Sequence, residues 1–235
     1  MNRRPQLVLK NPAPTRHNAE VRANGSRRVQ LAGRRARIAG DVCRGSYMPP
    51  ESWFEPTGEQ AGFVVLDHEA GKGFKHVLTE ADIRDRLAQL PEGMTRCLEV
   101  VQLSQMTRKK RVSPCYGMQW GATIYLYPIE ESRVEVFTSP PKPSQKIEAQ
   151  MFGARWVQDK KHWKLIWTED AIRDFYLNNV LIHELGHLVD QRNTTFKDRE
   201  RYAEWFAVEH GYKPSRKPDV AAQALAKMAV KRHHK

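Results

Sequence analysis

The chain has 235 residues, of which 40% are apolar and 28% charged, and its formal net charge is +12. This length suits one domain of ordinary size with terminal extensions, and the apolar fraction is sufficient for a hydrophobic core. Residues 5–45 contain no long apolar run behind the basic N-terminus, and no stretch reaches the roughly 20 apolar residues of a membrane helix. A secretory signal and a membrane partner are therefore not expected.

The positive charge is concentrated at the two ends of the chain. Residues 1–50 carry 11 Arg and Lys against two acidic residues, and residues 213–235 carry seven against one. The segment between them, 51–212, has a net charge of −3. We interpret 1–50 as a basic, largely disordered extension, 51–212 as the folded domain, and 213–235 as a basic, partly helical tail.

Cysteine usage indicates the cellular compartment. The three cysteines, Cys43, Cys97 and Cys115, have no metal-ligand spacing, and their odd number does not suggest a disulfide framework. Reduced thiols of this kind are typical of a cytoplasmic protein. A cytoplasmic location is therefore expected.

The first predicted elements of the folded part are a strand, a helix and a second strand. A strand is expected over 62–67 (GFVVLD), followed by a helix over 78–90 that Thr79 is placed to cap. A second strand is expected over 97–103. This order is compatible with a mixed α+β fold.

The middle of the chain is rich in strand signals. Segments 122–128 (ATIYLYP) and 133–138 (RVEVFT) are predicted to form a hairpin around a short polar turn. A Pro-rich loop over 139–144 precedes a weaker strand over 151–157. A stronger strand is expected over 163–168 (WKLIWT).

Two helices are expected to follow. The first is predicted over 169–191, with Thr168 as its cap, and the second over 197–210. Gly211 and then Pro214 are expected to stop the second helix. The sequence therefore predicts two consecutive helices joined by a short loop.

The first of these helices carries the pattern His183-Glu184-Leu185-Gly186-His187. Because His183 and His187 are four residues apart on a helix, both imidazoles leave the same face and can share one metal ion. Glu184 lies about 100° around the helix from His183, so it can reach a metal-bound water without being a ligand itself. Two imidazole ligands and a nearby carboxylate are the arrangement that a hydrolytic zinc site needs.

The residues around the pattern are mostly apolar, which predicts a buried helix. Buried histidines need a hydrogen-bond partner or a metal. Gly186 would give room for a close approach of the next helix. Asp190, three residues after His187, is expected to cap or bridge the loop to that helix.

A third ligand is expected from the second helix. At 100° per residue, Glu200, Ala203, Glu204 and Ala207 fall within one arc of about 100°. Two carboxylates between alanines suggest a face that lies close to another helix and delivers a carboxylate to it. Helix geometry alone does not choose between Glu200 and Glu204 as the ligand.

The motifs H-E-x-G-H-x-x-D at 183–190 and E-x-x-A-E-x-F at 200–206 resemble the gluzincin branch of the zincin metallopeptidases. They are most similar to the anthrax-lethal-factor-like catalytic domains, with the compact ImmA/IrrE-type peptidases next. The resemblance implies an α+β, zincin-like fold, in which a small mixed sheet packs on the active helix and the following helix carries the third ligand.

The resemblance also implies roles for individual residues. His183, His187 and Glu200 would be the ligands of Zn²⁺, and Glu184 would be the general base. Glu204 would hold a ligand histidine through its free ring N–H. Aromatic residues that could stabilise the transition state lie nearby, but the sequence does not rank Tyr202, His210 and Tyr212.

Three functions are compatible with these observations. The leading hypothesis is a zinc metallopeptidase that binds an extended polypeptide along an edge strand, either 122–128 or 163–168. A nucleic-acid-binding regulator that uses the domain as a sensor or scaffold is the second, because both ends are basic. A metal-dependent hydrolase of another carbonyl or phosphoryl group is the third.

Overall fold

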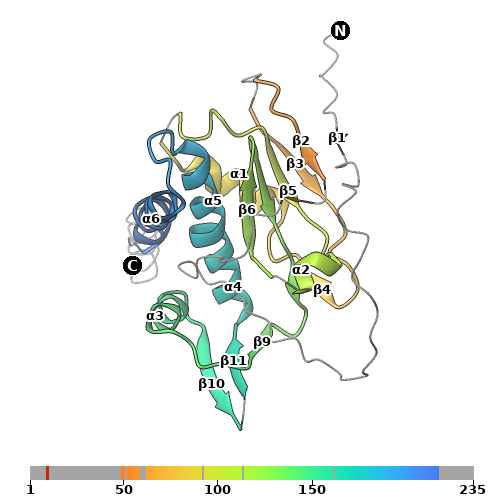
Figure 1. Ribbon diagram of the computed structural model, residues 1–235, viewed down its shortest axis with the longest axis vertical. Coiled ribbons are helices and arrows are strands. Elements are labelled where there is room, and N and C mark those ends of the chain that lie inside the picture. Colours follow the sequence, from red (N-terminus) through yellow and green to blue (C-terminus); the bar gives the residue numbers. More distant parts are fainter. Residues whose placement is uncertain are drawn as a thin grey trace, which may run out of the picture.

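The fold is α+β (Figure 1). The computed structural model describes residues 9–10, 49–50, 52–58, 62–91, 93–112, 114–160 and 162–216. Most of the two basic extensions lies outside these residues, so the division into extensions and domain stays a prediction. Among the described helices, none combines the length and the apolar character needed to cross a membrane.

The larger sheet has four strands in the order β3 (Val64–Asp67), β5 (Val100–Leu103), β7 (Thr123–Leu126), β6 (Gly117–Trp120). β3, β5 and β7 are parallel, whereas β6 runs antiparallel to β7 after a tight turn at Gly121, which has a positive φ of 59°. β5 and β7 are buried at every residue, as expected of inner strands that are covered on both faces. β6 is an edge strand of this mixed sheet.

The predicted hairpin between 122–128 and 133–138 is wrong. β7 pairs with β6, which precedes it, and β9 (Val134–Phe137) pairs instead with β11 (His162–Ile166) in a separate sheet. β6 is not among the predicted strands, because its four residues, GMQW, do not alternate between apolar and polar. The tight turn at Gly121 joins β6 to β7, so β7 forms its antiparallel pair with β6 and not with β9.

Both segments predicted to be a substrate-binding edge are internal. β7 lies between β5 and β6, and β11 is the central strand of a three-stranded sheet with the order β10 (Arg155–Asp159), β11, β9. β7 is buried at every residue, whereas Leu165 is the buried residue of β11. The edge strand of the larger sheet that contacts the helix carrying His183 is β6.

The segment before β10 is a helix and not a strand. α3 (Pro143–Met151) occupies the region that the sequence predicts as the end of a loop and the start of a strand over 151–157. A proline is tolerated in the first turn of a helix because its missing N–H would have no partner there. The prolines around residue 140 therefore mark the start of a helix, and the strand begins four residues later than predicted.

Several short elements complete the described fold. α1 (Glu80–Ala88) confirms the first predicted helix, and the Thr79 side chain caps it by accepting a hydrogen bond from the backbone N–H of Asp82. The remaining short elements are α2 (Arg108–Val112) and two paired sets of strands: β1 (Leu9–Lys10) with β2 (Trp53–Phe54), and β4 (Phe74–Lys75) with β8 (Ile129–Glu130).

The predicted long helix is confirmed as one continuous run of three parts. It consists of α4 (Glu169–Phe175), the π-helical segment η1 (Tyr176–Val180) and α5 (Leu181–Val189). The Thr168 side chain caps it by accepting a hydrogen bond from the backbone N–H of Ala171. The π-helical segment was not predicted.

The second helix is also confirmed, but its predicted end is wrong. α6 (Phe196–Ala207) continues through a second π-helical segment, η2 (Val208–Tyr212), into α7 (Lys213–Ser215). Gly211 therefore lies inside the helical run. A Cβ atom at this position would lie 2.0 Å from the backbone oxygen of Asn178 in η1, so the glycine permits the two runs to touch.

We expect the substitution Gly211→Ala to destabilise the fold. An alanine in place of a helical glycine normally stabilises by up to about 1 kcal/mol, but overpacking against a backbone atom costs about 1–3 kcal/mol or more. Because the contact is with a backbone atom at 2.0 Å, we expect the cost to lie at the upper end, so the free energy of unfolding, measured in urea, should fall by about 2 kcal/mol. Glu209→Ala is the control, because it removes only a solvent-accessible ion pair with Lys213. An unchanged Gly211→Ala midpoint would contradict the close contact.

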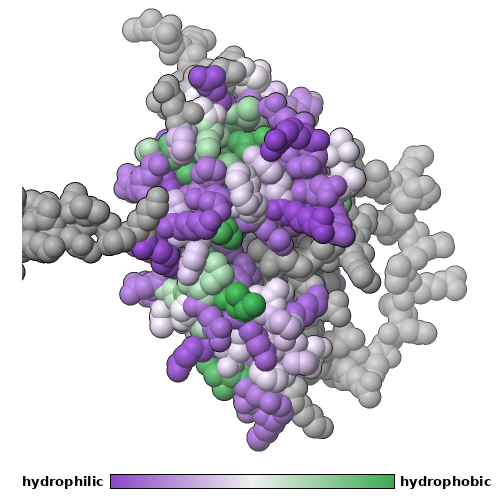
Figure 2. Space-filling model, turned by 90° about the vertical axis from the view of Figure 1, so that its left-hand side faces the viewer, coloured by the Kyte–Doolittle hydropathy of each residue, from purple (hydrophilic) through white to green (hydrophobic). Residues whose placement is uncertain are grey.

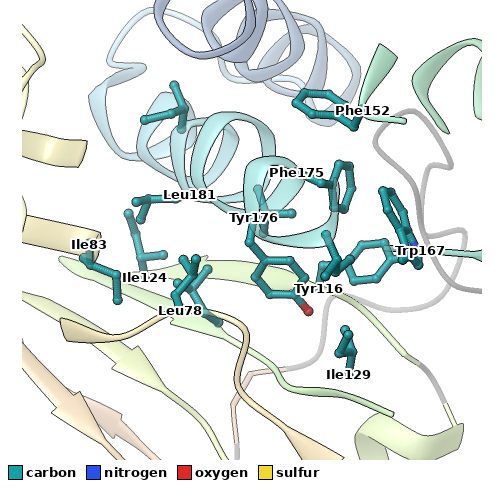
Figure 3. Packing of buried hydrophobic residues seen from close by; sticks show 14 of the residues in the cluster. Leu78, Ile83, Tyr116, Ile124, Ile129, Phe152, Trp167, Phe175, Tyr176 and Leu181 are labelled. Atoms are coloured by element: carbon teal, nitrogen blue, oxygen red, sulfur yellow. The ribbon is translucent and has the colours of Figure 1, made fainter. Parts of the chain in front are cut away.

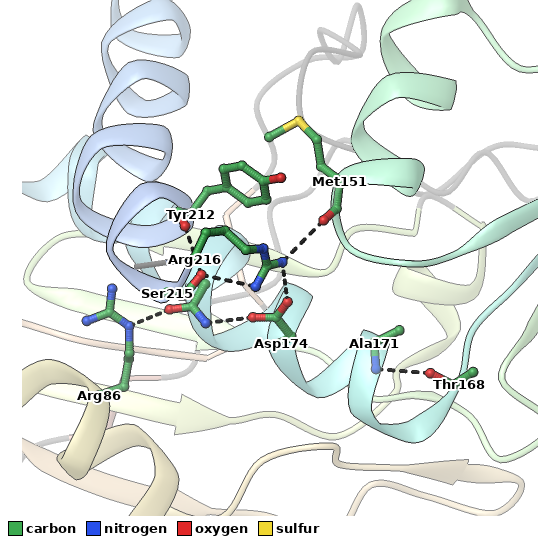
Figure 4. Close-up of polar contacts among 9 residues, drawn as sticks. Arg86, Met151, Thr168, Ala171, Asp174, Tyr212, Ser215 and Arg216 are labelled. Carbon is green, nitrogen blue, oxygen red and sulfur yellow. Dashed lines mark hydrogen bonds and ion pairs between the residues drawn. The ribbon is translucent and has the colours of Figure 1, made fainter. Parts of the chain in front are cut away.

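A polar network, buried at Arg86 and Asn178, ties the two helical runs together where the π-helical segments meet (Figure 4). The Arg86 guanidinium of α1 donates to the Asn178 side-chain oxygen at 2.6 Å and also to the carbonyl of His210. The Asn178 amide donates to Asp174 at 2.7 Å, and Asp174 also pairs with Arg216. The network fixes how α4–η1–α5 lies against α6–η2–α7.

The hydrophobic core lies between the larger sheet and the first helical run (Figure 3). Ile124 of β7 and Leu181 of α5 are fully buried, and the Tyr116 ring packs edge-on against Phe175 at 5.1 Å. At about 25 cal/mol per Å² of apolar area, such contacts are the main source of stability. They also fix the position of α5 relative to the strands.

Candidate metal centre

The buried helix α5 holds three of the predicted site residues. His183 and Glu184 are each 8% exposed, and His187 is half-buried. Leu181, Ile182 and Leu185 fill the core from the same helix. The apolar residues thus anchor α5, while the polar ones come together on the side that faces α6 and β6.

The structure brings His183, His187 and Glu200 into one cluster. The Nε2 atoms of the two histidines are 3.1 Å apart. The Glu200 carboxylate approaches His187 Nε2 at 3.4 Å and His183 Nε2 at 3.7 Å. The distance to His187 is from Oε1 and the distance to His183 is from Oε2, so the three residues, and not three single atoms, form a triangle with separations of 3.1, 3.4 and 3.7 Å.

The spacing of this triangle is compatible with a single metal ion bound to all three residues. Zinc–nitrogen distances of about 2.0–2.1 Å place neighbouring tetrahedral ligands about 3.3 Å apart, which is close to all three separations. Two imidazole nitrogens that face each other repel through their lone pairs unless a proton or a cation lies between them. The donor set of two imidazoles and one carboxylate is also typical of zinc.

Helix α6 delivers Glu200 because it lies very close to α5. The Thr195 side chain caps α6, and a Cβ atom at Gly186 would lie 3.0 Å from Ala203 Cα and 3.1 Å from Phe206 Cβ. Gly186 therefore gives the room that the sequence predicts. The Arg199 guanidinium also donates to the His187 carbonyl at 3.0 Å, which ties α6 to the end of α5.

The outer side of α6 faces solvent. Hydrophilic residues predominate on the face of the molecule shown in Figure 2, which includes this helix. Phe196 and Trp205 are exceptions, with 45% and 50% of their surface exposed. The polar outer side and the buried Ala203 and Phe206 make α6 amphipathic, which explains why it packs with its Glu200 side toward α5.

The protonation preferences of the two histidines differ. Burial, followed by the charge of His187, lowers the pKa of His183 to about 3, although Glu200 opposes this change. Burial also lowers the pKa of His187, but the hydrogen bond with Glu200 and the charges of Glu184 and Glu200 outweigh it and raise the pKa. The His183 imidazole is therefore neutral near pH 7, which is the form of histidine that binds a metal.

Glu184 lies where the sequence predicts a base. Burial raises its pKa to about 7, against the opposing charge of His187 and a hydrogen bond from the backbone N–H of Gln119. Lys110 also lowers this pKa, through its charge. A carboxyl group with a pKa near neutrality can both accept and release a proton.

The edge strand β6 presses against Glu184. A Cβ atom at Gly117 would lie 2.7 Å from Val180 Cγ1 and 2.9 Å from Glu184 Cγ. This contact was not predicted from the sequence. A glycine within a short strand is the signal that would have found it, because it often marks a close backbone approach.

Glu204 lies one turn after Glu200 and is half-buried. Burial and the charge of Glu200 raise its pKa. The predicted hydrogen bond to a ligand histidine is not formed to His183, since the buried Nδ1 of His183 has no partner among the described residues. Of the two carboxylates that the helix geometry left open, the structure brings Glu200 to the histidines.

Asp190 organises the loop between α5 and α6. Its carboxylate accepts hydrogen bonds from the backbone N–H groups of Arg192 and Asn193, each at 3.2 Å, and from the Asn193 side chain. Asp190 is 6% exposed and is not in the metal-binding cluster. Its contacts are those of a residue that shapes the loop.

The aromatic candidates for transition-state stabilisation lie on α6 and η2. Tyr202 packs against Trp205, and the His210 ring lies 4.5 Å from that of Phe206. Tyr212 contacts Phe152 and Arg216. At 1.5 Å per residue, His210 and Tyr212 are about 15–18 Å beyond Glu200 along the helix, so neither is assigned this role.

Comparison with known proteins gives no relative for this chain. No family model matches it, and neither a curated protein nor a solved structure matches it significantly. The chemistry of the site is therefore inferred from its own residues.

Proposed function

We propose that the protein is a zinc-dependent metallopeptidase. The observation that carries this proposal is the triangle of His183, His187 and Glu200, whose separations of 3.1, 3.4 and 3.7 Å suit one tetrahedral ion. Glu184 adjoins this triangle on the same helix. Three protein ligands leave a fourth position for water, which distinguishes a catalytic zinc site from a structural one.

In the proposed reaction, three residues would bind the metal and a fourth would transfer the proton. His183, His187 and Glu200 would hold the zinc ion, which when bound lowers the pKa of a coordinated water molecule toward neutrality. Glu184 would accept the proton from the attacking water and pass it to the departing amine. Its position against β6 would aim the carboxylate at a substrate that lies along this strand.

We propose β6 as the strand that binds the substrate. It is the edge strand beside α5, and an edge strand can pair with an extended peptide through backbone hydrogen bonds. Such pairing depends little on side chains, so it identifies a polypeptide as the class of substrate. The antiparallel edge strand, the helix α5 and the carboxylate from α6 together support a zincin-like fold of the gluzincin type.

The close contact between β6 and Glu184 leads to a prediction for Gly117→Ala. The added methyl group would displace either the strand or the carboxylate, and a misplacement of about 1 Å can lower a rate by roughly 10²-fold. Zinc content should not change, because the three atoms nearest to the added methyl group belong to Val180 and Glu184 and not to a proposed ligand. Peptide turnover and bound zinc measured on the same preparation check this result.

Met118→Leu is the matched control for this prediction, since it changes the next residue of β6 while conserving its volume. It should cleave peptides at close to the wild-type rate. Full activity of Gly117→Ala would show that the approach of β6 does not position Glu184.

Cleavage of an unbiased peptide library, with and without a chelator, tests the proposed function. We expect cleavage that the chelator abolishes and added zinc restores. Hydrolysis of phosphoesters or non-peptide amides without peptide cleavage would favour a metal-dependent hydrolase of another carbonyl or phosphoryl group. A lack of any hydrolysis would favour the nucleic-acid-binding regulator, whose basic segments lie largely outside the described residues. A cytoplasmic location is part of the proposal and rests on the sequence.

A further inference from the structure

Lys110 is a lysine in an unusual environment. It belongs to a run of four basic residues at 108–111, which at first sight resembles an exposed charged patch. Its neighbours are engaged, because Lys109 donates to the carbonyl of Pro49 and the Arg111 guanidinium lies over the Phe74 ring. Lys110 itself is only 6% exposed.

The amine of Lys110 is surrounded by sulfur atoms and an aromatic ring. Its Nζ lies 3.0 Å from Cys115 Sγ, 3.9 Å from Met118 Sδ and 4.2 Å from the centre of the Tyr127 ring. Among the described residues, no oxygen atom accepts a hydrogen bond from it. A buried amine normally has a carboxylate or carbonyl partner, so the thiol of Cys115 takes the place of one.

The pair is accessible to small molecules. Lys110 and Cys115 both line a pocket of about 50 Å³, whose walls include Phe74 and Ile129. This volume exceeds the roughly 10–15 Å³ that a single water molecule requires. Hydrogen peroxide, which is little larger than water, fits such a space.

We infer that Lys110 and Cys115 form an oxidation site, at which a peroxide links the two side chains through a covalent S–N bond. The positive charge beside the thiol stabilises the thiolate, which is the form that peroxides attack. This inference goes beyond the proposed peptidase activity and does not depend on the metal centre.

The reaction has two balanced steps. The Cys115 thiolate attacks one peroxide oxygen and the O–O bond breaks. The hydroxide that leaves takes a proton from the Lys110 ammonium, which gives a sulfenic acid, a neutral amine and one water molecule. The Lys110 nitrogen then attacks the sulfur, the S–O bond breaks, and the hydroxyl group leaves as water with a proton from the amine. Thiol, amine and hydrogen peroxide thus become a sulfenamide and two water molecules. The separation of 3.0 Å places the nitrogen in contact with the sulfur before the reaction.

Peptide mapping of the whole chain after treatment with hydrogen peroxide tests the inference. Trypsin cuts after Lys109 and Arg111, so we expect the dipeptide 110–111 to be joined to the peptide 112–133, which contains Cys115. The joined product should be lighter than its two parts by two hydrogen atoms. A thiol reductant should separate them again, because sulfenamides are reversible.

Cys97 is an internal control on the same chain. It is exposed and lies in no disulfide, and no described lysine amine hydrogen-bonds to it. It should give sulfinic and sulfonic acids without a link to any lysine. In Lys110→Met, Cys115 should be oxidised to the same acids as Cys97.

Two results would overturn the inference. One is oxidation of Cys115 in the wild-type chain to sulfinic acid while Lys110 stays unmodified. The other is a failure of Cys115 to react at peroxide concentrations that oxidise Cys97. Both are read from the wild-type protein, so the conclusion does not depend on whether Lys110→Met folds.

Discussion

Replacing Glu184 with glutamine is expected to lower peptide turnover by about 10²- to 10⁴-fold, the loss typical of removing a general base. Glutamine keeps the shape of the side chain and one hydrogen-bonding oxygen, but it cannot accept a proton. The zinc content should stay near that of the wild type, because Glu184 is outside the ligand triangle. The measurement is the rate of cleavage of a peptide from the library assay, with zinc determined on the same sample.

His183→Ala is the matched comparison for this variant, since it changes the preceding residue on the same helix. It should lose both zinc and activity, whereas Glu184→Gln should lose activity alone. Cleavage by Glu184→Gln at the wild-type rate would contradict the role of Glu184 as the base. The reaction would then take place elsewhere, or the metal would have a structural role.

The second large effect is expected at Glu200. Glu200→Gln should lose most of the bound zinc, because the Glu200 carboxylate lies 3.4 and 3.7 Å from the two imidazole nitrogens and carries the negative charge of the site. Glu204→Gln is the matched control, one helical turn away. It should retain zinc with a loss of affinity no greater than the roughly 10- to 100-fold of residues that support a ligand.

Competition with a zinc-binding chelator measures both affinities. The pair of variants carries the same chemical change on the same helix, so differences in helix propensity cancel. Loss of zinc from Glu204→Gln with retention by Glu200→Gln would reverse the assignment of the third ligand. We expect Glu200 to be the third ligand, since no described hydrogen bond joins Glu204 to His183.

The helices of the site could be predicted from the sequence because their signals are local. The spacing of His183 and His187, the apolar residues around them and the cap at Thr168 all act within a few turns of one helix. The close approach at Gly186 was also predictable, since a glycine on a buried helix face leaves room for a neighbour. These features need no knowledge of distant partners.

The strand pairing could not be predicted because it depends on segments far apart in the chain. The apolar patterns of 122–128 and 133–138 are correct for strands, but nothing in them selects between β6, β9 and β11 as partners. Periodicity identifies a strand and not its neighbour. The predicted substrate edge failed for the same reason.

The roles of two glycines also could not be predicted from the neighbouring sequence. Gly211 was interpreted as a helix stop, which is its commonest use near the end of a helix. In the structure it allows contact with the backbone of Asn178, and Gly117 similarly allows contact with Glu184. Both roles depend on a segment that is remote in the sequence, so the residue type alone does not distinguish them.

Metal analysis of the purified 235-residue chain shows whether His183, His187 and Glu200 bind zinc. The geometry of His183, His187 and Glu200 predicts about one tightly bound zinc per chain, and none in a His183→Ala, His187→Ala double variant. Inductively coupled plasma mass spectrometry after dialysis against zinc and then against buffer gives this ratio. A wild-type chain that retains no zinc, or a double variant that retains as much as the wild type, would contradict the metal centre.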